Sequence, residues 1–113
     1  MKKNREYTPL EAKELVEGEY FIFTEAMPID VRNDKNLPAF THGELVYFPK
    51  NQIVHCINTE QDDKYTTIGV LYQFMVIDDT NKTRYFDIVS LQLPYYLDFA
   101  PPYLIAAFDM DII

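Results

Sequence analysis

This sequence has little of several residue types, and each scarcity excludes something. Its 113 residues contain one cysteine, Cys56, so no disulfide can form within the chain and a reducing compartment is expected. The three glycines, Gly18, Gly43 and Gly69, are too scattered to form a phosphate-binding loop. No apolar run approaches the roughly 20 residues that span a bilayer, and the basic segment 1–6 is not followed by one. We therefore expect a cytoplasmic protein without a signal peptide and without membrane contact.

Positive charge is also scarce. The chain has 10 Lys and Arg residues against 18 Asp and Glu residues, which gives a formal net charge of −8. Nucleic-acid binding usually depends on cations that displace counterions from phosphates. An acidic total therefore argues against strong non-specific binding and requires a local basic patch for any specific binding. The simpler interpretation is that the charge keeps a small domain soluble.

Catalytic and metal-binding patterns are missing as well. His55 and Cys56 would be adjacent in a predicted strand, so their side chains would point to opposite faces and could not pair easily as base and nucleophile. With His42, the chain has three Cys and His residues, fewer than the four ligands of a structural zinc site. Asp109 and Asp111 could hold a divalent ion, but a solvated strand face explains their spacing more simply. We predict no enzyme activity, no metal and no cofactor.

What the chain does have is the composition of one ordered domain. Hydrophobic residues make up 48% of it and charged residues 25%, which suffices for one core without disulfide or metal. Aromatic residues reach 15%, with nine Tyr and eight Phe, and aromatic side chains favour half-buried strands. We predict a single domain over residues 1–113, with residues 1–6 frayed.

The N-terminal region carries the signals of a short helix. Thr8 can cap the helix, Pro9 suits the first helical position, and Glu11 can reach back to the cap as in a capping box. Gly18 stands where a left-handed C-terminal cap is expected. The pattern predicts a helix over residues 9–17.

Most of the remaining sequence has the patterns of strands separated by turn residues. The long segment 30–43 is rich in Asn, Asp, Pro and Gly and predicts a loop, and ordered loops of this length are often functional. The turn at residues 78–83 predicts a hairpin between its flanking strands. Strands are predicted at residues 19–27, 44–48, 52–58, 65–77 and 84–93, with a sixth left open at 104–113. The fold class is mainly β with one short N-terminal helix (α+β), as a small mixed β-barrel or a curled sheet of five to six strands.

One group of residues combines cations with an aromatic ring. Arg32, Lys35 and Lys50 lie in or near the long loop, and Tyr47 is close to them in sequence. Recognition of single-stranded RNA combines cations for phosphates with aromatic platforms for bases. These four residues are the predicted RNA-binding site. The alternative is that the aromatic residues belong to the core and the cations are ordinary surface residues.

The segment at residues 8–18, TPLEAKELVEG, continues into EYFIF at residues 19–23. This order of an amphipathic helix, a glycine and a first barrel strand resembles PUA-like domains. In length, acidity and strand-rich pattern the whole chain also resembles the PrgU family, small regulators on the pheromone-responsive conjugative plasmids of enterococci. The resemblance implies a PUA-like barrel and a regulatory role that restrains production of a conjugation surface adhesin through RNA. It supplies no catalytic residues.

Two other functions stay open on the sequence. An acidic surface could dock on a basic partner protein, including as a nucleic-acid mimic that inhibits it; the carboxylates would then have to cluster. A small-molecule-binding barrel would require an apolar pocket. The sequence leaves homo-oligomer formation open.

Overall fold

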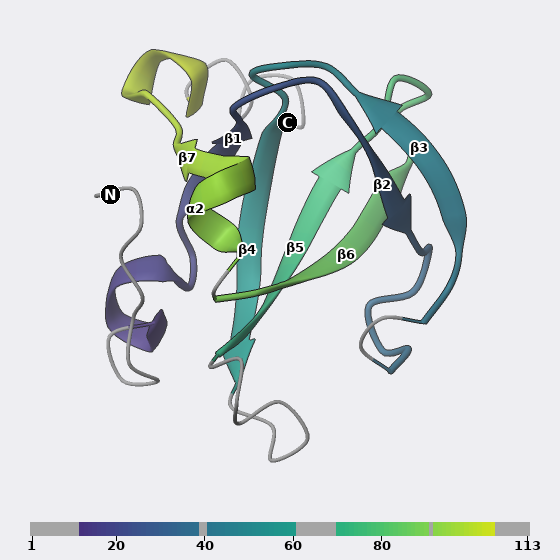
Figure 1. The fold of residues 1–113 in the computed structure, drawn as a ribbon, viewed down its shortest axis with the longest axis horizontal. Coiled ribbons are helices and arrows are strands. Elements are labelled where there is room, and N and C mark those ends of the chain that lie inside the picture. Colours follow the sequence, from purple (N-terminus) through teal and green to yellow (C-terminus); the bar gives the residue numbers. More distant parts are fainter. Residues whose placement is uncertain (1–11, 39–40, 61–69, 91, 106–113) are drawn as a thin grey trace.

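The protein folds into two antiparallel sheets with short helical turns, described here from a computed structural model (Figure 1). The structure describes residues 12–38, 41–60, 70–90 and 92–105. In chain order the elements are η1 (Ala12–Val16), β1 (Tyr20–Phe23), β2 (Met27–Val31), β3 (Glu44–Phe48), β4 (Ile53–Glu60), β5 (Leu71–Ile77), β6 (Thr83–Val89), α2 (Leu93–Tyr96) and β7 (Leu97–Phe99).

The larger sheet has five strands in the order β6-β5-β4-β1-β7, and every neighbouring pair is antiparallel. The β5–β6 hairpin is continuous in register from Leu71 opposite Val89 to Ile77 opposite Thr83. This confirms the hairpin predicted around residues 78–83. The β4–β5 register shifts between Cys56 and Asn58, which is the geometry of a β-bulge and bends β4.

The second sheet is the hairpin of β2 and β3, called here the β2–β3 ribbon. Among the described residues, one isolated backbone bridge joins it to the larger sheet: Arg32 and Tyr85 exchange two hydrogen bonds of 2.9 and 2.8 Å. Because backbone groups alternate in direction along a strand, Pro28 and Asp30 face the same side of β2 as Arg32 does. Pro28 has no N–H to donate there, so continuous pairing between β2 and β6 cannot extend past it.

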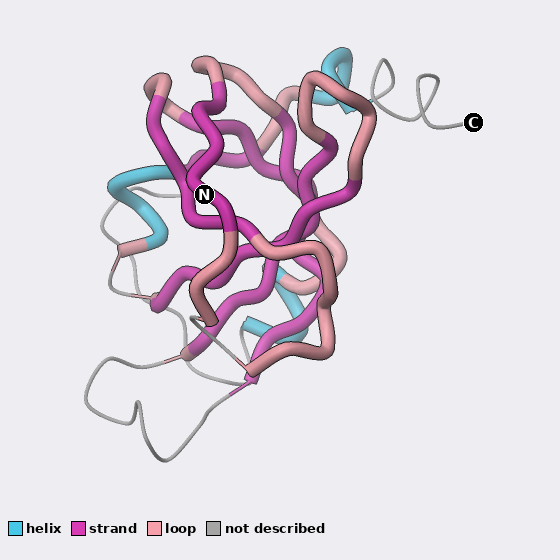
Figure 2. Tube along the Cα trace, turned by 90° about the vertical axis from the view of Figure 1, so that its right-hand side faces the viewer, coloured by secondary structure: helices cyan, strands magenta, loops and turns pink. Residues whose placement is uncertain are grey.

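Aromatic side chains fill the space between the sheets. The ring of Phe74 lies 5.3 Å from that of Phe86 and 5.6 Å from that of Phe21, measured between centroids. The ring of Phe23 lies 5.8 Å from Phe48 and 5.9 Å from Phe86, so the ribbon contributes to the same core. Figure 2 shows how strands dominate the described chain and how short the helical turns are. The aromatic enrichment seen in the sequence therefore belongs largely to packing between strands.

Of the helix predicted over residues 9–17, the structure describes the part from Ala12 onward, which forms the helical turn η1 over Ala12–Val16. Residues 8–11, with the predicted capping box, lie outside the described residues. The helical turn η1 is closed by a hydrogen bond of 2.9 Å from the N–H of Glu17 to the carbonyl oxygen of Ala12, the wide spacing of a π-turn. Gly18 follows with a φ of 87°, which confirms the predicted left-handed cap.

Two predicted strands and one predicted loop differ from the elements of the structure. The strand predicted at 19–27 is divided: β1 ends at Phe23, and Met27 begins β2 after a turn. The predicted loop 30–43 begins within a strand, because β2 runs to Val31 and Pro28 is tolerated on its unpaired side. The strand predicted at 84–93 ends at Val89, and Leu93 opens α2. Residues 102–105 form a helical turn, while 106–113, with Asp109 and Asp111, lie outside the described residues.

The mainly-β class is confirmed: seven strands occur in the described part of the chain. Over those residues the two sheets do not close into a barrel, since β3 is paired only with β2 and β7 only with β1. Within the described ranges, no helix has the length and apolar character needed to cross a membrane.

Candidate functional site

The strongest candidate site is the cleft where β2 separates from β6. The two strands touch at the Arg32–Tyr85 bridge, and Gln92 and Tyr96 contribute to the lining from the α2 segment. The cleft has a volume of about 460 Å³, within the range typical of small-ligand sites. Its lining is formed by Met27, Pro28, Ile29, Asp30, Arg32, Thr41, His42, Phe86, Asp87, Ile88, Gln92 and Tyr96.

The lining of this β2–β6 cleft combines apolar side chains with polar ones. Met27 and Ile29 on β2 are half-buried, and Phe86 and Ile88 on β6 form the facing wall. Tyr96 of α2 is 38% exposed and contributes an aromatic ring at the rim. Such a lining suits a flat ligand that has apolar faces and polar edges.

Arg32 and Asp87 form a buried ion pair at the inner end of the cleft. The two Nη atoms of Arg32 donate to the two carboxylate oxygens of Asp87 at 2.5 and 3.0 Å. Their side chains are 3% and 2% exposed, so solvent screens the pair very little. The Nε of Arg32 is buried too, and no acceptor among the described residues lies within hydrogen-bond distance of it.

Asp30, another residue of the lining, ties β2 to residues 42 and 43. Its Oδ1 accepts a hydrogen bond of 2.9 Å from the backbone N–H of Gly43, and its Oδ2 lies 3.0 Å from Nδ1 of His42. The Gly43 N–H, followed by the His42 side chain, holds the pKa of Asp30 below its ordinary value of 3.8. A Cβ on residue 43 would lie 2.0 Å from the carbonyl oxygen of Val31, so only glycine allows β2 and the start of β3 to approach this closely.

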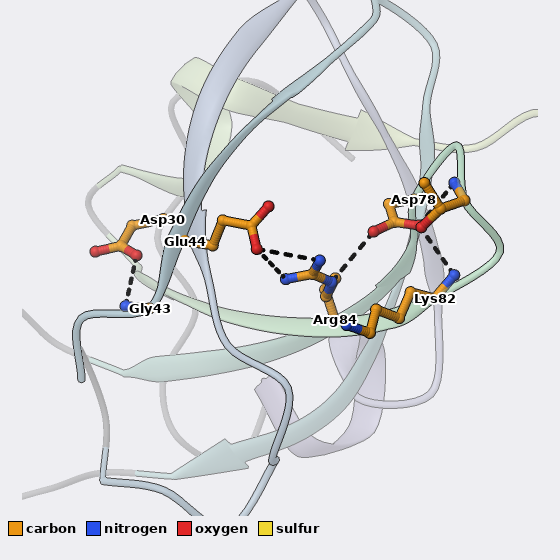
Figure 3. A network of polar contacts seen from close by, with 7 residues as sticks. Asp30, Gly43, Glu44, Asp78, Lys82 and Arg84 are labelled. Atoms are coloured by element: carbon orange, nitrogen blue, oxygen red, sulfur yellow. Dashed lines mark hydrogen bonds and ion pairs between the residues drawn. The ribbon is translucent and has the colours of Figure 1, made fainter.

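A second arginine ties the start of β3 to the β5–β6 turn. Nε of Arg84 donates to Oδ2 of Asp78 at 3.1 Å, and both its Nη atoms lie 3.4 Å from one oxygen of Glu44 (Figure 3). Burial alone would raise the pKa of Asp78, but hydrogen bonds from Thr80 and Lys82 and the charge of Arg84 together hold it below 3.8. These contacts place Arg84 in a structural role and leave it unavailable to a phosphate.

The structure does not bring the four predicted RNA-binding residues together. Arg32 is buried against Asp87, while Lys35 is exposed and shares with Arg32 a smaller hollow of about 210 Å³. Tyr47 is 68% exposed and is paired with Pro28, four residues from Arg32 along β2. At about 3.3 Å per residue this is about 13 Å. Lys50 lies in the turn beyond β3, so the four residues form two groups at opposite ends of the ribbon.

Cys56 and His55 point to opposite faces of β4, as predicted. Cys56 is fully buried, and this burial raises the pKa of its thiol to about 12, which keeps the thiol protonated and unreactive. The imidazole of His55 stacks on the ring of Tyr20 at a centroid distance of 4.3 Å. Within the described ranges, no group of three His, Cys, Asp or Glu residues is arranged to hold a metal ion.

Comparisons with protein-family models, with curated proteins and with solved structures found no match. The resemblance to PUA-like domains and to the PrgU family therefore stays a prediction from the sequence. The cleft itself was not predicted. Its apolar walls come from three separate segments with no shared local pattern, and only the proline inside β2 gives a sequence signal that pairing with a neighbouring strand must stop.

Proposed function

We propose that this chain is a non-catalytic regulatory module of the PUA-like type that binds single-stranded RNA by holding an unstacked base in the β2–β6 cleft. By its resemblance to the PrgU family, its role would be to restrain expression of conjugation surface proteins encoded on a plasmid. The observation that carries the proposal is the cleft, whose lining combines apolar residues, the tyrosine Tyr96 and polar residues.

The chemistry of the cleft suits a nucleobase. Sequence-specific proteins read single-stranded RNA by packing splayed bases against aromatic or apolar groups and by bonding their polar edges. Among the residues that line the cleft, Tyr96 can offer aromatic surface, while Asp30 and Gln92 carry polar groups that could bond the edge of a base. The carboxylate of Asp30 is an acceptor, which favours a base that carries an exocyclic amino group.

This mode of binding also agrees with the acidic surface. Both arginines of the described chain, Arg32 and Arg84, are buried in ion pairs. The exposed cations among the described side chains are Lys35, Lys50 and Lys82. Binding should therefore depend mainly on the base and only weakly on phosphate contacts, with a shallow decrease of affinity as salt rises.

Adjacent tyrosines on α2 provide a matched test. Tyr96 lines the cleft, whereas Tyr95 is 70% exposed and does not. Nucleic-acid-free protein would be titrated with single-stranded and hairpin RNAs of mixed sequence at several salt concentrations. Stacking is worth about 1–3 kcal/mol per base, so Tyr96→Ala should weaken binding roughly 5- to 150-fold and Tyr95→Ala should leave it unchanged. No saturable binding at low salt, or equal effects of the two substitutions, would contradict the proposal.

The same titration tests the residues predicted from sequence. Lys35→Glu and Lys50→Glu should each change the slope of log affinity against log salt by about one if each lysine contacts a phosphate. If both lysines prove neutral and Tyr96→Ala weakens binding, the cleft is the site. If Lys50→Glu and Tyr47→Ala weaken binding and Tyr96→Ala does not, the site is the far end of the ribbon.

A second function is favoured by the distribution of charge. Exposed acidic residues outnumber the three exposed lysines among the described side chains: they are Glu14, Glu19, Glu25, Asp30, Asp34, Glu44, Glu60 and Asp79. An acidic interaction module, or a nucleic-acid mimic, would use this excess to dock on a basic protein. It would bind a basic partner in a strongly salt-sensitive way and would not bind RNA.

A further inference from the structure

Two large apolar side chains are exposed on β3. Leu45 and Tyr47 are 71% and 68% exposed and stand on the same face of the ribbon. Within the described part of the chain β3 pairs only with β2, and Figure 1 shows it along the outer margin of the fold. An unpaired strand edge is a template for another strand. Natural edges are usually protected by lysine, proline or a bulge, and none of these occurs between Glu44 and Phe48.

The register identifies which backbone groups face outward. The backbone of Arg32 is bonded to Tyr85 of β6, so by alternation Val31 and Ile29 are bonded towards β3. Their partners on β3 are Glu44 and Val46. The backbone N–H and C=O groups of Leu45 and Tyr47 therefore point away from β2, towards the open edge. The two residues with exposed apolar side chains are also those with outward backbone groups.

We infer that this edge pairs with the β3 strand of a second copy of the chain, antiparallel and about a twofold axis at Val46. In that register Leu45 of each copy lies opposite Tyr47 of the other, and each such pair exchanges two hydrogen bonds. The apolar side chains then meet across the interface, as a twofold interface between identical chains requires. The inference goes beyond the proposed RNA binding and does not depend on it.

The charges at the ends of β3 agree with this pairing. Glu44, the only charged residue of the strand, falls opposite Phe48 of the second copy and not opposite another carboxylate. It also lies 3.4 Å from the guanidinium of Arg84, which offsets its charge. The pairing of β3 with itself therefore brings no like charges directly together, although each whole chain carries a net charge of −8.

The association should be weak and should strengthen with salt. An edge of five residues is much smaller than the standard interface of about 800 Å² per partner. Two chains of the same net charge repel each other, and added salt screens that repulsion within a Debye length of about 10 Å at 0.1 M. A basic foreign strand on the same edge would show the opposite salt dependence.

Charge substitutions at the two exposed positions test the register directly. One variant combines Leu45→Lys with Tyr47→Lys, and a second combines Leu45→Glu with Tyr47→Glu. Each alone places like charges opposite each other and should be monomeric. A mixture of the two places opposite charges at every cross-strand pair and should restore the dimer. Both variants keep a negative net charge, so restored pairing cannot come from overall attraction. Tyr95→Lys, on the equally exposed Tyr95 of α2, is the control and should behave as the wild type.

Sedimentation equilibrium of the full chain, at protein concentrations up to about 1 mM and at low and high salt, measures all of these states. A wild-type dimer that increases with salt, is lost in each variant and returns in the mixture supports the inference. A wild type that stays monomeric throughout, or variants that associate as well as the wild type, would overturn it. Circular dichroism of each variant checks that the fold is kept. A folded mixture that fails to associate excludes this register.

Discussion

The five-stranded sheet and the β2–β3 ribbon are two regions of one small fold that are held by different interactions. Strands β4 and β5 lie inside the larger sheet, with neighbours on both sides and fully buried side chains such as Val54 and Phe74. The ribbon has one open edge and half-buried residues such as Ile29 and Val46. It is fastened at one corner by a backbone bridge and by buried arginines.

The two regions differ in what stabilises them and in the surface that they offer for binding. Apolar packing stabilises the sheet without requiring any single polar contact. The ribbon depends on charges that have been removed from water, and such charges must be paired. Both candidate surfaces, the cleft and the β3 edge, belong to the ribbon. The region with the weaker attachment is therefore the one that offers binding surface, as is common for functional elements.

Asp87→Ala is expected to have the largest effect. It leaves Arg32 buried without a counter-charge, which costs about 3–5 kcal/mol of unfolding free energy. Urea denaturation measures the loss. Hydrogen exchange should locate it, with faster exchange in β2 and β3 than in β4. Asp79→Ala in the exposed turn is the control and should change stability by less than about 0.5 kcal/mol. A small loss for Asp87→Ala would mean that the ion pair does not fasten the ribbon.

Substitution of Gly43, beside the ribbon, and of Gly18, before the larger sheet, compares the backbone requirements of the two regions. Gly43→Ala forces a Cβ against the Val31 carbonyl oxygen and should cost about 1–3 kcal/mol, as overpacking does. Gly18→Ala meets no atom within 4 Å but keeps a φ of 87°, so it should cost about 1 kcal/mol from backbone strain alone. Gly18→Asn should recover part of that cost, because Asn tolerates the left-handed conformation, whereas Gly43→Asn should not. Thermal unfolding of the four variants distinguishes a steric from a conformational requirement.

Acid should destabilise the corner that Asp78 holds. The pKa of Asp78 is lowered in the folded protein, so the folded state binds the proton less readily than the unfolded state. The stability that this residue contributes is complete above the unfolded pKa of about 3.9 and is lost as pH falls through the lower folded value. In Asp78→Asn, the decrease of unfolding free energy below about pH 4 should be shallower than in the wild type. If the unfolding free energy of the two proteins decreases equally as the pH falls, this role of Asp78 is contradicted.

The smallest effect is expected at the open edge. Leu45→Ala changes a side chain that is 71% exposed and should alter the stability of the monomer by less than about 0.5 kcal/mol. Leu97→Ala removes a side chain of the same type that is fully buried and should cost about 2–5 kcal/mol. The unfolding free energies of the two variants are compared by denaturation at low protein concentration, where pairing between copies is absent. A large loss at Leu45 would mean that its side chain packs within its own chain.

Sequence patterns predicted the local features of this fold well. The hairpin at residues 78–83 followed from two alternating segments around a polar turn, and the cap at Gly18 from a glycine after an amphipathic run. β3 has the predicted bounds 44–48, because a loop rich in turn residues precedes it and Pro49 follows. Each of these depends on interactions between residues close in sequence.

The features that were missed depend on contacts between distant residues. The predicted strand 19–27 stops before Pro28, yet Pro28 lies within β2, because its missing donor faces the side where pairing stops. Arg32 was predicted as an RNA-binding residue, and only the approach of β6, 55 residues later, buries it against Asp87. The cleft follows from that same divergence of β2 and β6. No local pattern contains these facts.

The buried thiol of Cys56 gives the chain a built-in reporter of motion. A thiol with a pKa of about 12 and no exposed surface cannot react with an alkylating reagent until β4 opens. Because the chain has no other cysteine, a single mass shift reports each such event. The labelling rate in water divided by that of the denatured chain gives the fraction of time for which the centre of the sheet is open. Cys56 lies in the core to which the ribbon also contributes, so this rate reports every opening that uncovers that core.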